Sequence, residues 1–226
     1  MAERGGLIQL TPVGARRELR PPALDRLRRE RLVRRAQLLA WGGNAWHLIE
    51  FAVAVGAGVA AGSIALVGFG ADSLIESLGG FIILWRFASR RSRSESAERR
   101  AQQLVAASYA LLVTYIVVEA TRTLIGGDHP AVSWVGIGLA AFTAPSMPLL
   151  ARAKRLVGHQ LNSAATVSEA GQNQICAYLS IALLAGLLLN AVAGWWWADP
   201  GTALLIAGFA LREGRESWRG NACDCC

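Results

Sequence analysis

Two carboxylate residues lie four positions apart inside a long apolar segment of the chain. Asp72 and Glu76 occur in the stretch GSIALVGFGADSLIESLGGFIILWRF, and residues four apart share one face of a helix. An ionisable side chain inside a bilayer costs about 2.5 kcal/mol or more, so this pair requires a compensating partner. A divalent cation held between the two carboxylates is one solution. Protonation, or hydrogen bonding to neighbouring helices, is the alternative.

Two further apolar segments carry polar residues at helical spacing. The stretch SAATVSEAGQNQICAYLSIALLAGLLLN contains Glu169, Gln172 and Cys176 on one helical stripe. An earlier stretch adds His47 and Glu50, although hydrogen bonding between helices would equally explain the histidine. Carboxylate, imidazole and thiol groups together are typical ligands of zinc-like divalent ions. By itself, Cys176 is also compatible with a small buried core residue.

The elements that must position these residues are apolar segments separated by basic ones. The chain has 226 residues, of which 53% are hydrophobic, and a net charge of +7. Six apolar stretches are each long enough to cross about 30 Å of hydrocarbon. They span residues 37–60, 63–85, 101–125, 131–150, 163–189 and 193–211. The pattern predicts an all-α integral membrane protein, built as a bundle of six transmembrane helices.

The positions of the basic residues predict how the bundle is oriented. Clusters of Lys and Arg occupy residues 4–35, 86–100, 152–155 and 212–219, and the opposite connections carry none. The positive-inside rule then places both termini in the cytoplasm. The charge therefore reflects topology in a multi-pass protein of the cell membrane, with the lipid bilayer as its partner and no nucleic acid. Residues 23–36 are further expected to form a basic surface helix.

The expected organisation follows from these segments. A basic cytoplasmic segment covers residues 1–36, the membrane domain covers 37–212, and a short cytoplasmic tail covers 213–226. Counted from the cytoplasmic ends of their helices, the candidate ligands lie about 14–20 Å inside at about 1.5 Å per residue. Three helices are thus expected to direct ligands to one layer near the middle of the bilayer. Sulfur among those ligands favours Zn²⁺, Cd²⁺ or Co²⁺ over Mg²⁺ or Ca²⁺.

The stretch GSIALVGFGADSLIES resembles a motif of the cation diffusion facilitator family, SxALxADSLxD, in which acidic residues stand four apart. The resemblance covers roughly residues 37–212. It implies a six-helix transporter that exports zinc, cadmium, cobalt, iron or manganese ions. It also implies that Asp72 and Glu76 are metal ligands. Because carboxylates and a thiol must lose their protons to bind a metal, we expect export of a zinc, cadmium, cobalt or iron ion in exchange for protons. The sequence WWWADP is similar to the family's Asp-Pro start of the sixth helix, with Asp199 as the N-terminal cap of that helix.

The chain departs from the family pattern on the fifth helix. Where the family has a His and an Asp, this sequence has Gln172 and Cys176. The usual tetrahedral ligand set is therefore incomplete, and Glu169, Glu50 or His47 are the candidates to complete it. The resemblance also implies a cytoplasmic domain after the sixth helix, which this sequence is expected to lack. That domain supports dimerisation in the family, so a homodimer is left open.

The chain ends in a cysteine-containing sequence, NACDCC. Cys223, Cys225 and Cys226 are candidate accessory ligands for a thiophilic ion. The alternative function is accordingly a membrane-anchored metal-binding or sensing protein that acts through this tail. A disordered tail without function is a further alternative. No nucleophile–base pair, phosphate-binding glycine loop or HExxH motif is present, so we expect neither an enzyme nor a resident cofactor.

Overall fold

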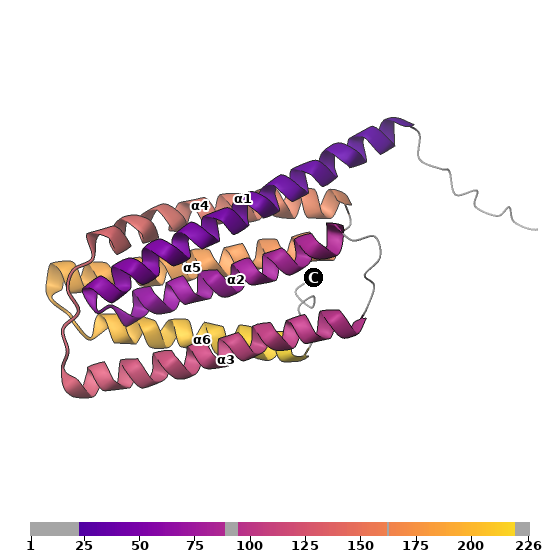
Figure 1. Cartoon of the computed structure of the whole chain (residues 1–226). Helices are drawn as coiled ribbons and strands as arrows, with labels where there is room; N and C mark the ends of the chain where they lie inside the picture. The colour runs from indigo at the N-terminus through magenta and orange to yellow at the C-terminus, as the bar shows by residue number, and fades with distance from the viewer. Residues whose placement is uncertain (1–22, 89–94, 162, 220–226) are drawn as a thin grey trace, which may run out of the picture.

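The structure, a computed structural model, describes residues 23–88, 95–161 and 163–219. This part of the chain forms six α-helices that lie side by side along a common direction (Figure 1). Their bounds are α1 Ala23–Ala61, α2 Ile64–Ala88, α3 Glu95–Gly126, α4 Trp134–Leu161, α5 Ala164–Ala193 and α6 Ala198–Arg219. No strand occurs among these described residues. The predicted all-α fold is therefore confirmed for them.

Several helices extend beyond the predicted apolar segments. The α1 helix runs unbroken through residues 23–36 and on to Ala61, so the predicted basic surface helix is the first part of one long helix. The α4 helix contains Pro145 and Pro148 yet continues to Leu161, beyond the predicted end at residue 150. The run of apolar residues in the sequence shows only how far a helix contacts hydrocarbon. A helix continues into water as long as its backbone hydrogen bonds are made within the helix.

Four stretches of these helices are long and apolar enough to cross a membrane. They are Leu27–Ala61, Ala106–Gly126, Trp134–Leu161 and Glu169–Ala193. They belong to α1, α3, α4 and α5. The α2 helix, which carries the buried pair Asp72 and Glu76, and the α6 helix, which begins with Ala-Asp-Pro-Gly-Thr and ends in charged residues, are not among these four.

The six helices alternate in direction, which separates the two ends of the bundle. The start of α1, the ends of α2, α4 and α6, and the starts of α3 and α5 share one end (Figure 1). We call it the basic end, because the Arg residues of α1, α4 and α6 gather there. At the opposite end Trp134, Trp195 and Trp197 are exposed, as expected of an aromatic belt. Glu119 and Arg122, three residues apart on α3, form an ion pair, with Nη1 and Oε1 2.6 Å apart.

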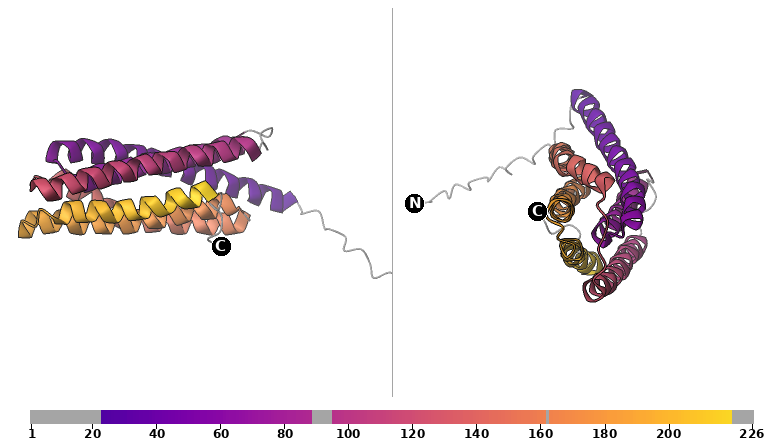
Figure 2. Two further views of the ribbon diagram at one scale, coloured as in Figure 1. Left: turned by 90° about the horizontal axis from the view of Figure 1, so that it is seen from below. Right: turned by 90° about the vertical axis from the view of Figure 1, so that its left-hand side faces the viewer.

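The α2 helix is the centre of the bundle, since it contacts α1, α3, α5 and α6. The end-on view in Figure 2 shows the other five helices arranged around it. Small residues bring α1 and α2 close together. A Cβ atom on Gly58 would lie 2.7 Å from Val67 Cγ2, and one on Gly70 would lie 2.9 Å from Val55 Cγ2. These two glycines therefore allow α1 and α2 to approach closely.

Asp199 caps a different helix from the one predicted. The α6 helix already begins at Ala198, so Asp199 lies in its first turn. The carboxylate accepts hydrogen bonds from Ser63 Oγ at 2.5 Å, Ile64 N at 2.9 Å and Ala65 N at 3.3 Å. These donors are the free N–H groups and the capping side chain at the start of α2. Asp199 thus ties α6 to α2 at the opposite end from the basic one.

Removing this carboxylate is expected to destabilise the bundle. Asp199→Ala leaves two buried N–H groups and the Ser63 hydroxyl without their acceptor, which should lower the free energy of unfolding by about 2 kcal/mol. Asp199→Asn keeps one acceptor oxygen and should cost less. The unfolding of purified protein in mixed micelles, followed by tryptophan fluorescence, measures both. Equal stability of Asp199→Ala and wild type would show that the cap contributes nothing.

Candidate metal site

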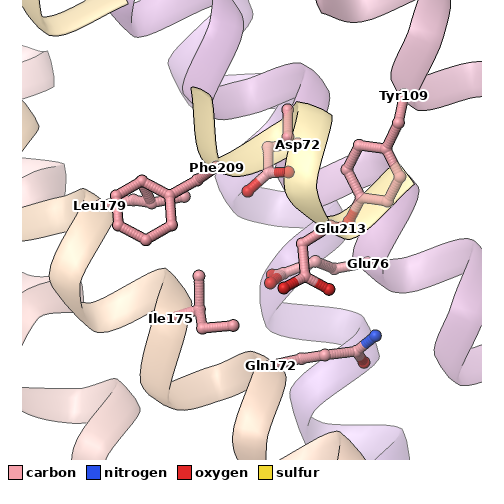
Figure 3. A pocket seen from close by; sticks show the side chains of 9 residues that line it. Asp72, Glu76, Tyr109, Gln172, Ile175, Leu179, Phe209 and Glu213 are labelled. Carbon is pink, nitrogen blue, oxygen red and sulfur yellow. The ribbon is translucent and has the colours of Figure 1, made fainter. Parts of the chain in front are cut away.

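Asp72 and Glu76 line a small cavity inside the bundle (Figure 3). Both lie on α2, one turn apart, with only 5% and 8% of their surface exposed. The cavity has a volume of about 10 Å³, which is room for about one water molecule or ion. Its lining residues are Asp72, Glu76, Tyr109, Gln172, Ile175, Leu179, Phe209, Ala210 and Glu213. Four helices, α2, α3, α5 and α6, therefore contribute to one polar cavity.

Two polar lining residues, Tyr109 and Glu213, are absent from the candidates that the sequence suggested. Figure 3 shows the Glu213 carboxylate beside that of Glu76, with the Tyr109 hydroxyl directed toward them. A signal for Glu213 was present in the sequence of α6. The buried positions of this helix are Ala203, Ile206, Ala207 and Ala210. Glu213 follows Ala210 by three residues and so lies on the same face of the helix. The charged residues next to it in the sequence suggested instead that it belongs to a solvent-exposed tail.

A second group of ligand-type side chains lies next to the cavity, between α1, α2 and α5. We call His47, Glu50, Glu76 and Cys176 the buried cluster, since none is more than 8% exposed. His47 Nδ1 lies 3.4 Å from Glu50 Oε2 and 3.3 Å from Glu76 Oε2. Cys176 Sγ lies 3.9 Å from Glu50 Oε2. Glu76 belongs both to the cavity and to the buried cluster, so the two groups are continuous.

Neighbouring polar residues orient the buried cluster. Thr143 Oγ1 donates to Glu50 Oε1 at 2.6 Å, and Ser73 Oγ donates to Glu50 Oε2 at 2.9 Å. Asn173 Nδ2 lies 3.1 Å from His47 Nε2 and 3.5 Å from Met147 Sδ. Supporting contacts of this kind hold metal ligands in place in known sites. These contacts could not be predicted from the sequence, because each joins two helices that meet only in the folded bundle.

Glu169 lies in different surroundings from the other candidate ligands. Its Oε2 atom lies 3.5 Å from Lys154 Nζ, and both side chains are buried. The sequence grouped Lys154 with Arg152 and Arg155 in one basic block, and the structure shows that Lys154 is buried, with 2% of its surface exposed. At helical spacing, one position of such a block can turn inward while its neighbours face solvent. The ammonium group of Lys154 thus lies beside the Glu169 carboxylate and offsets its charge.

The three candidate ligands of α5 therefore divide among three surroundings. Gln172 lines the cavity, Cys176 belongs to the buried cluster, and Glu169 pairs with Lys154. Both predicted residues of α1, His47 and Glu50, lie in the buried cluster. The predicted accessory ligands Cys223, Cys225 and Cys226 lie outside the described residues.

Comparison with known proteins agrees with the family resemblance of the sequence. Residues 45–222 match the cation efflux transmembrane domain. Metal tolerance protein 5 of Oryza sativa subsp. japonica is 26% identical over 207 residues, which are 84% of this chain and 48% of the relative. A protein of Paramagnetospirillum magneticum (strain ATCC 700264 / AMB-1) described as a putative transporter, MamV, is 36% identical over 94 residues, which are 41% of this chain and 28% of the relative.

The chain spans about half the length of the rice relative and less than a third of the bacterial one. The family match itself covers most of the chain and includes the whole of α2 to α6. It therefore includes every residue of the cavity and of the buried cluster. The chain belongs to the cation efflux family, through its transmembrane domain.

Proposed function

We propose that this protein carries a divalent metal cation across a membrane through the cavity and the buried cluster. One observation carries the proposal: the buried carboxylates of Asp72 and Glu76 line a cavity with room for about one ion. A cation offsets carboxylate charge that neither lipid nor an apolar core can solvate. The family and the names of the relatives, one for metal tolerance and one for transport, support the same activity.

All six helices are proposed to cross the membrane, with the basic end in the cytoplasm. The α2 and α6 helices lie alongside the other four (Figure 1) and, with 25 and 22 residues, are each long enough to cross about 30 Å of hydrocarbon. The cations gather at one end, and the connections at the other end carry no Lys or Arg. Glu213 lies in the last turns of α6, so the cavity is nearer the cytoplasmic side.

Exchange for protons is the proposed source of energy. Carboxylates and a thiol must lose their protons to bind a metal, so each binding event releases protons and each release of the ion takes them up. If the ion site opens alternately to the two sides of the membrane, an inward proton gradient drives the ion outward. The ions that we propose are Zn²⁺, Cd²⁺, Co²⁺ or Fe²⁺.

The proposal predicts a large loss of flux in Asp72→Asn. This change keeps the size of the side chain but removes a negative ligand from the cavity. Substitution of a residue that only supports the ligands of a metal site already lowers the metal affinity about 10- to 100-fold. We expect pH-driven Zn²⁺ or Co²⁺ uptake by proteoliposomes to fall at least about tenfold. The matched control is Glu119→Gln, an acidic residue paired with Arg122 on the surface. Wild-type flux in Asp72→Asn would refute the proposed path.

A further inference from the structure

The geometry points to a tetrahedral site for one thiophilic divalent ion, such as Zn²⁺, Cd²⁺ or Co²⁺, within the buried cluster. Its ligands are His47 Nδ1, Glu50 Oε2, Glu76 Oε2 and Cys176 Sγ. This inference rests on the proposed function for the statement that the bound ion is the cargo. It deepens that function by naming the four atoms that hold the ion and the class of ion they select.

The distances between these atoms match the edges of a coordination tetrahedron. Zinc binds nitrogen and oxygen at about 2.0–2.2 Å and sulfur at about 2.3 Å, so two ligand atoms of one ion lie about 3.3–3.8 Å apart. The measured separations are 3.3 Å for His47 to Glu76, 3.4 Å for His47 to Glu50 and 3.9 Å for Cys176 to Glu50. The ligand atoms of His47, Glu76 and Cys176 all lie within 4.8 Å of one another. Glu50 is not part of this group of three, so binding of an ion by all four residues would bring the Glu50 and Glu76 carboxylates closer together.

Two of the four atoms are buried and lack a hydrogen-bond partner. Among the described residues, His47 Nδ1 and Glu76 Oε2 are both unpartnered in this sense, although they lie 3.3 Å apart. Their residues are 3% and 8% exposed. A buried polar atom without a partner costs about 1–3 kcal/mol, so a hydrogen-bonded polar core does not explain this arrangement. A cation between the two atoms would satisfy both.

The other carboxylate ligand, Glu50, is held in position from outside the site. The Thr143 hydroxyl donates a hydrogen bond to Glu50 Oε1, and the Ser73 hydroxyl, on α2, donates one to Glu50 Oε2. A carboxylate oxygen has a second lone pair, so Oε2 can accept from Ser73 and still bind an ion. Glu50 is 0% exposed. Rigid support of this kind prepares a ligand for its ion.

Asn173 controls which nitrogen of His47 is free to bind. An imidazole that binds a metal through Nδ1 carries its proton on Nε2, and this N–H needs an acceptor. Asn173 lies 3.1 Å from Nε2, and its Oδ1 atom is among the buried atoms without a partner. Turning the amide over would place Oδ1 against Nε2–H, at the cost of the contact with Met147. Asn173 is thus a positioning residue that sets the tautomer of His47.

The donor set distinguishes classes of ions. A thiolate and an imidazole favour Zn²⁺, Cd²⁺ and Co²⁺, whereas Mg²⁺ and Ca²⁺ need more oxygen ligands than this cluster supplies. The polar residues that line the adjacent cavity provide only oxygen ligands, from Asp72, Gln172, Glu213 and the Tyr109 hydroxyl. Since Glu76 belongs to both groups, it can pass an ion from the cavity to the buried cluster. Selection by sulfur then occurs at the second position.

Cobalt binding tests the inference without any measurement of transport. The full-length protein is purified with Cys223, Cys225 and Cys226 replaced by Ser, so that Cys176 is the remaining cysteine. Titration with Co²⁺ should produce the intense visible bands of a tetrahedral ion and a thiolate-to-cobalt charge-transfer band, saturating at one ion per chain. Cys176→Ser should lose the charge-transfer band, and His47→Gln should weaken the visible bands. Glu119→Gln is the matched control and should keep both.

X-ray absorption of the zinc-loaded protein gives a second readout that needs no substitution in the site. One sulfur atom should appear in the first shell of zinc, and its absence would overturn the inference. A charge-transfer band that persists in Cys176→Ser would overturn it as well. For the tautomer, Asn173→Asp should bind Co²⁺ at least as tightly as wild type, and Asn173→Leu at least about tenfold more weakly. Flux that depends on Asp72, together with a sulfur-free zinc site, would retain the transporter and refute this ligand set.

Discussion

Replacing Lys154 by Met is expected to lower the free energy of unfolding by about 3–5 kcal/mol, the usual cost of removing one partner of a buried ion pair. Lys154 and Glu169 are 2% and 6% exposed, and Nζ lies 3.5 Å from Oε2. Without the ammonium group, the Glu169 carboxylate has no cation beside it. Its second oxygen, Oε1, already lacks a hydrogen-bond partner among the described residues. The penalty therefore comes from an isolated buried charge.

A double substitution separates this charge effect from packing. Met fills nearly the same space as Lys, which matters because Nζ lies close to α1: a Cβ on Gly43 would be 2.9 Å from it. Glu169→Gln in the Lys154→Met background removes the isolated carboxylate and should restore most of the lost stability. Unfolding in mixed micelles, followed by tryptophan fluorescence, supplies the four values of the cycle. A double variant as unstable as Lys154→Met alone would contradict the proposed role of the pair.

Glu76→Gln is expected to have the largest effect on function, because Glu76 is shared by the cavity and the buried cluster. Asp72→Asn removes a ligand from the cavity alone, whereas Glu76→Gln weakens both positions of the ion. We expect the loss of Zn²⁺ flux to exceed that of Asp72→Asn, at about 100-fold or more. Zn²⁺ flux in proteoliposomes measures the loss of transport, and Co²⁺ titration of the same preparation measures the loss of ion binding.

The same variant gives a pH signature with a definite sign. Metal ions compete with protons for carboxylates and thiols, so affinity rises as the pH rises, as long as these ligands still titrate. Glu76→Gln removes one of the titrating ligands. The slope of log affinity against pH should therefore fall by up to about one, while Glu119→Gln should leave it unchanged. An unaltered slope in Glu76→Gln would mean that Glu76 does not exchange its proton for the ion.

Much of the architecture was accessible from the sequence, because it depends on local spacing. The apolar stretches located all six helices, and helical geometry placed Asp72 and Glu76 on one face of α2, where both line the cavity. The Glu119–Arg122 pair on α3 is likewise local, since the two residues stand three apart on one helix. Helix ends were less accessible. Water, charged residues and caps decide where a helix stops, as the extension of α4 to Leu161 shows.

The pairing of side chains from different helices was decided only by the tertiary structure. Spacing indicates which residues share a face, but the rotation of each helix and the choice of its neighbours determine what that face meets. Asp199 accepts a hydrogen bond from Ser63, a residue 136 positions away, although local reasoning assigned it to its own helix. Lys154 appeared to belong to a solvated block until the contact between α4 and α5 buried it against Glu169.

The proposed metal ligands show both contributions. The residue types determined that this protein has carboxylates, an imidazole and a thiol inside its helices, and the motif around Asp72 and Glu76 determined its family. Packing decided that Glu213 joins the cavity and that His47, Glu50 and Cys176 meet at Glu76. The physical reason is that a coordination site is a set of distances between atoms. Such distances, when the atoms come from different helices, exist only once the helices have packed.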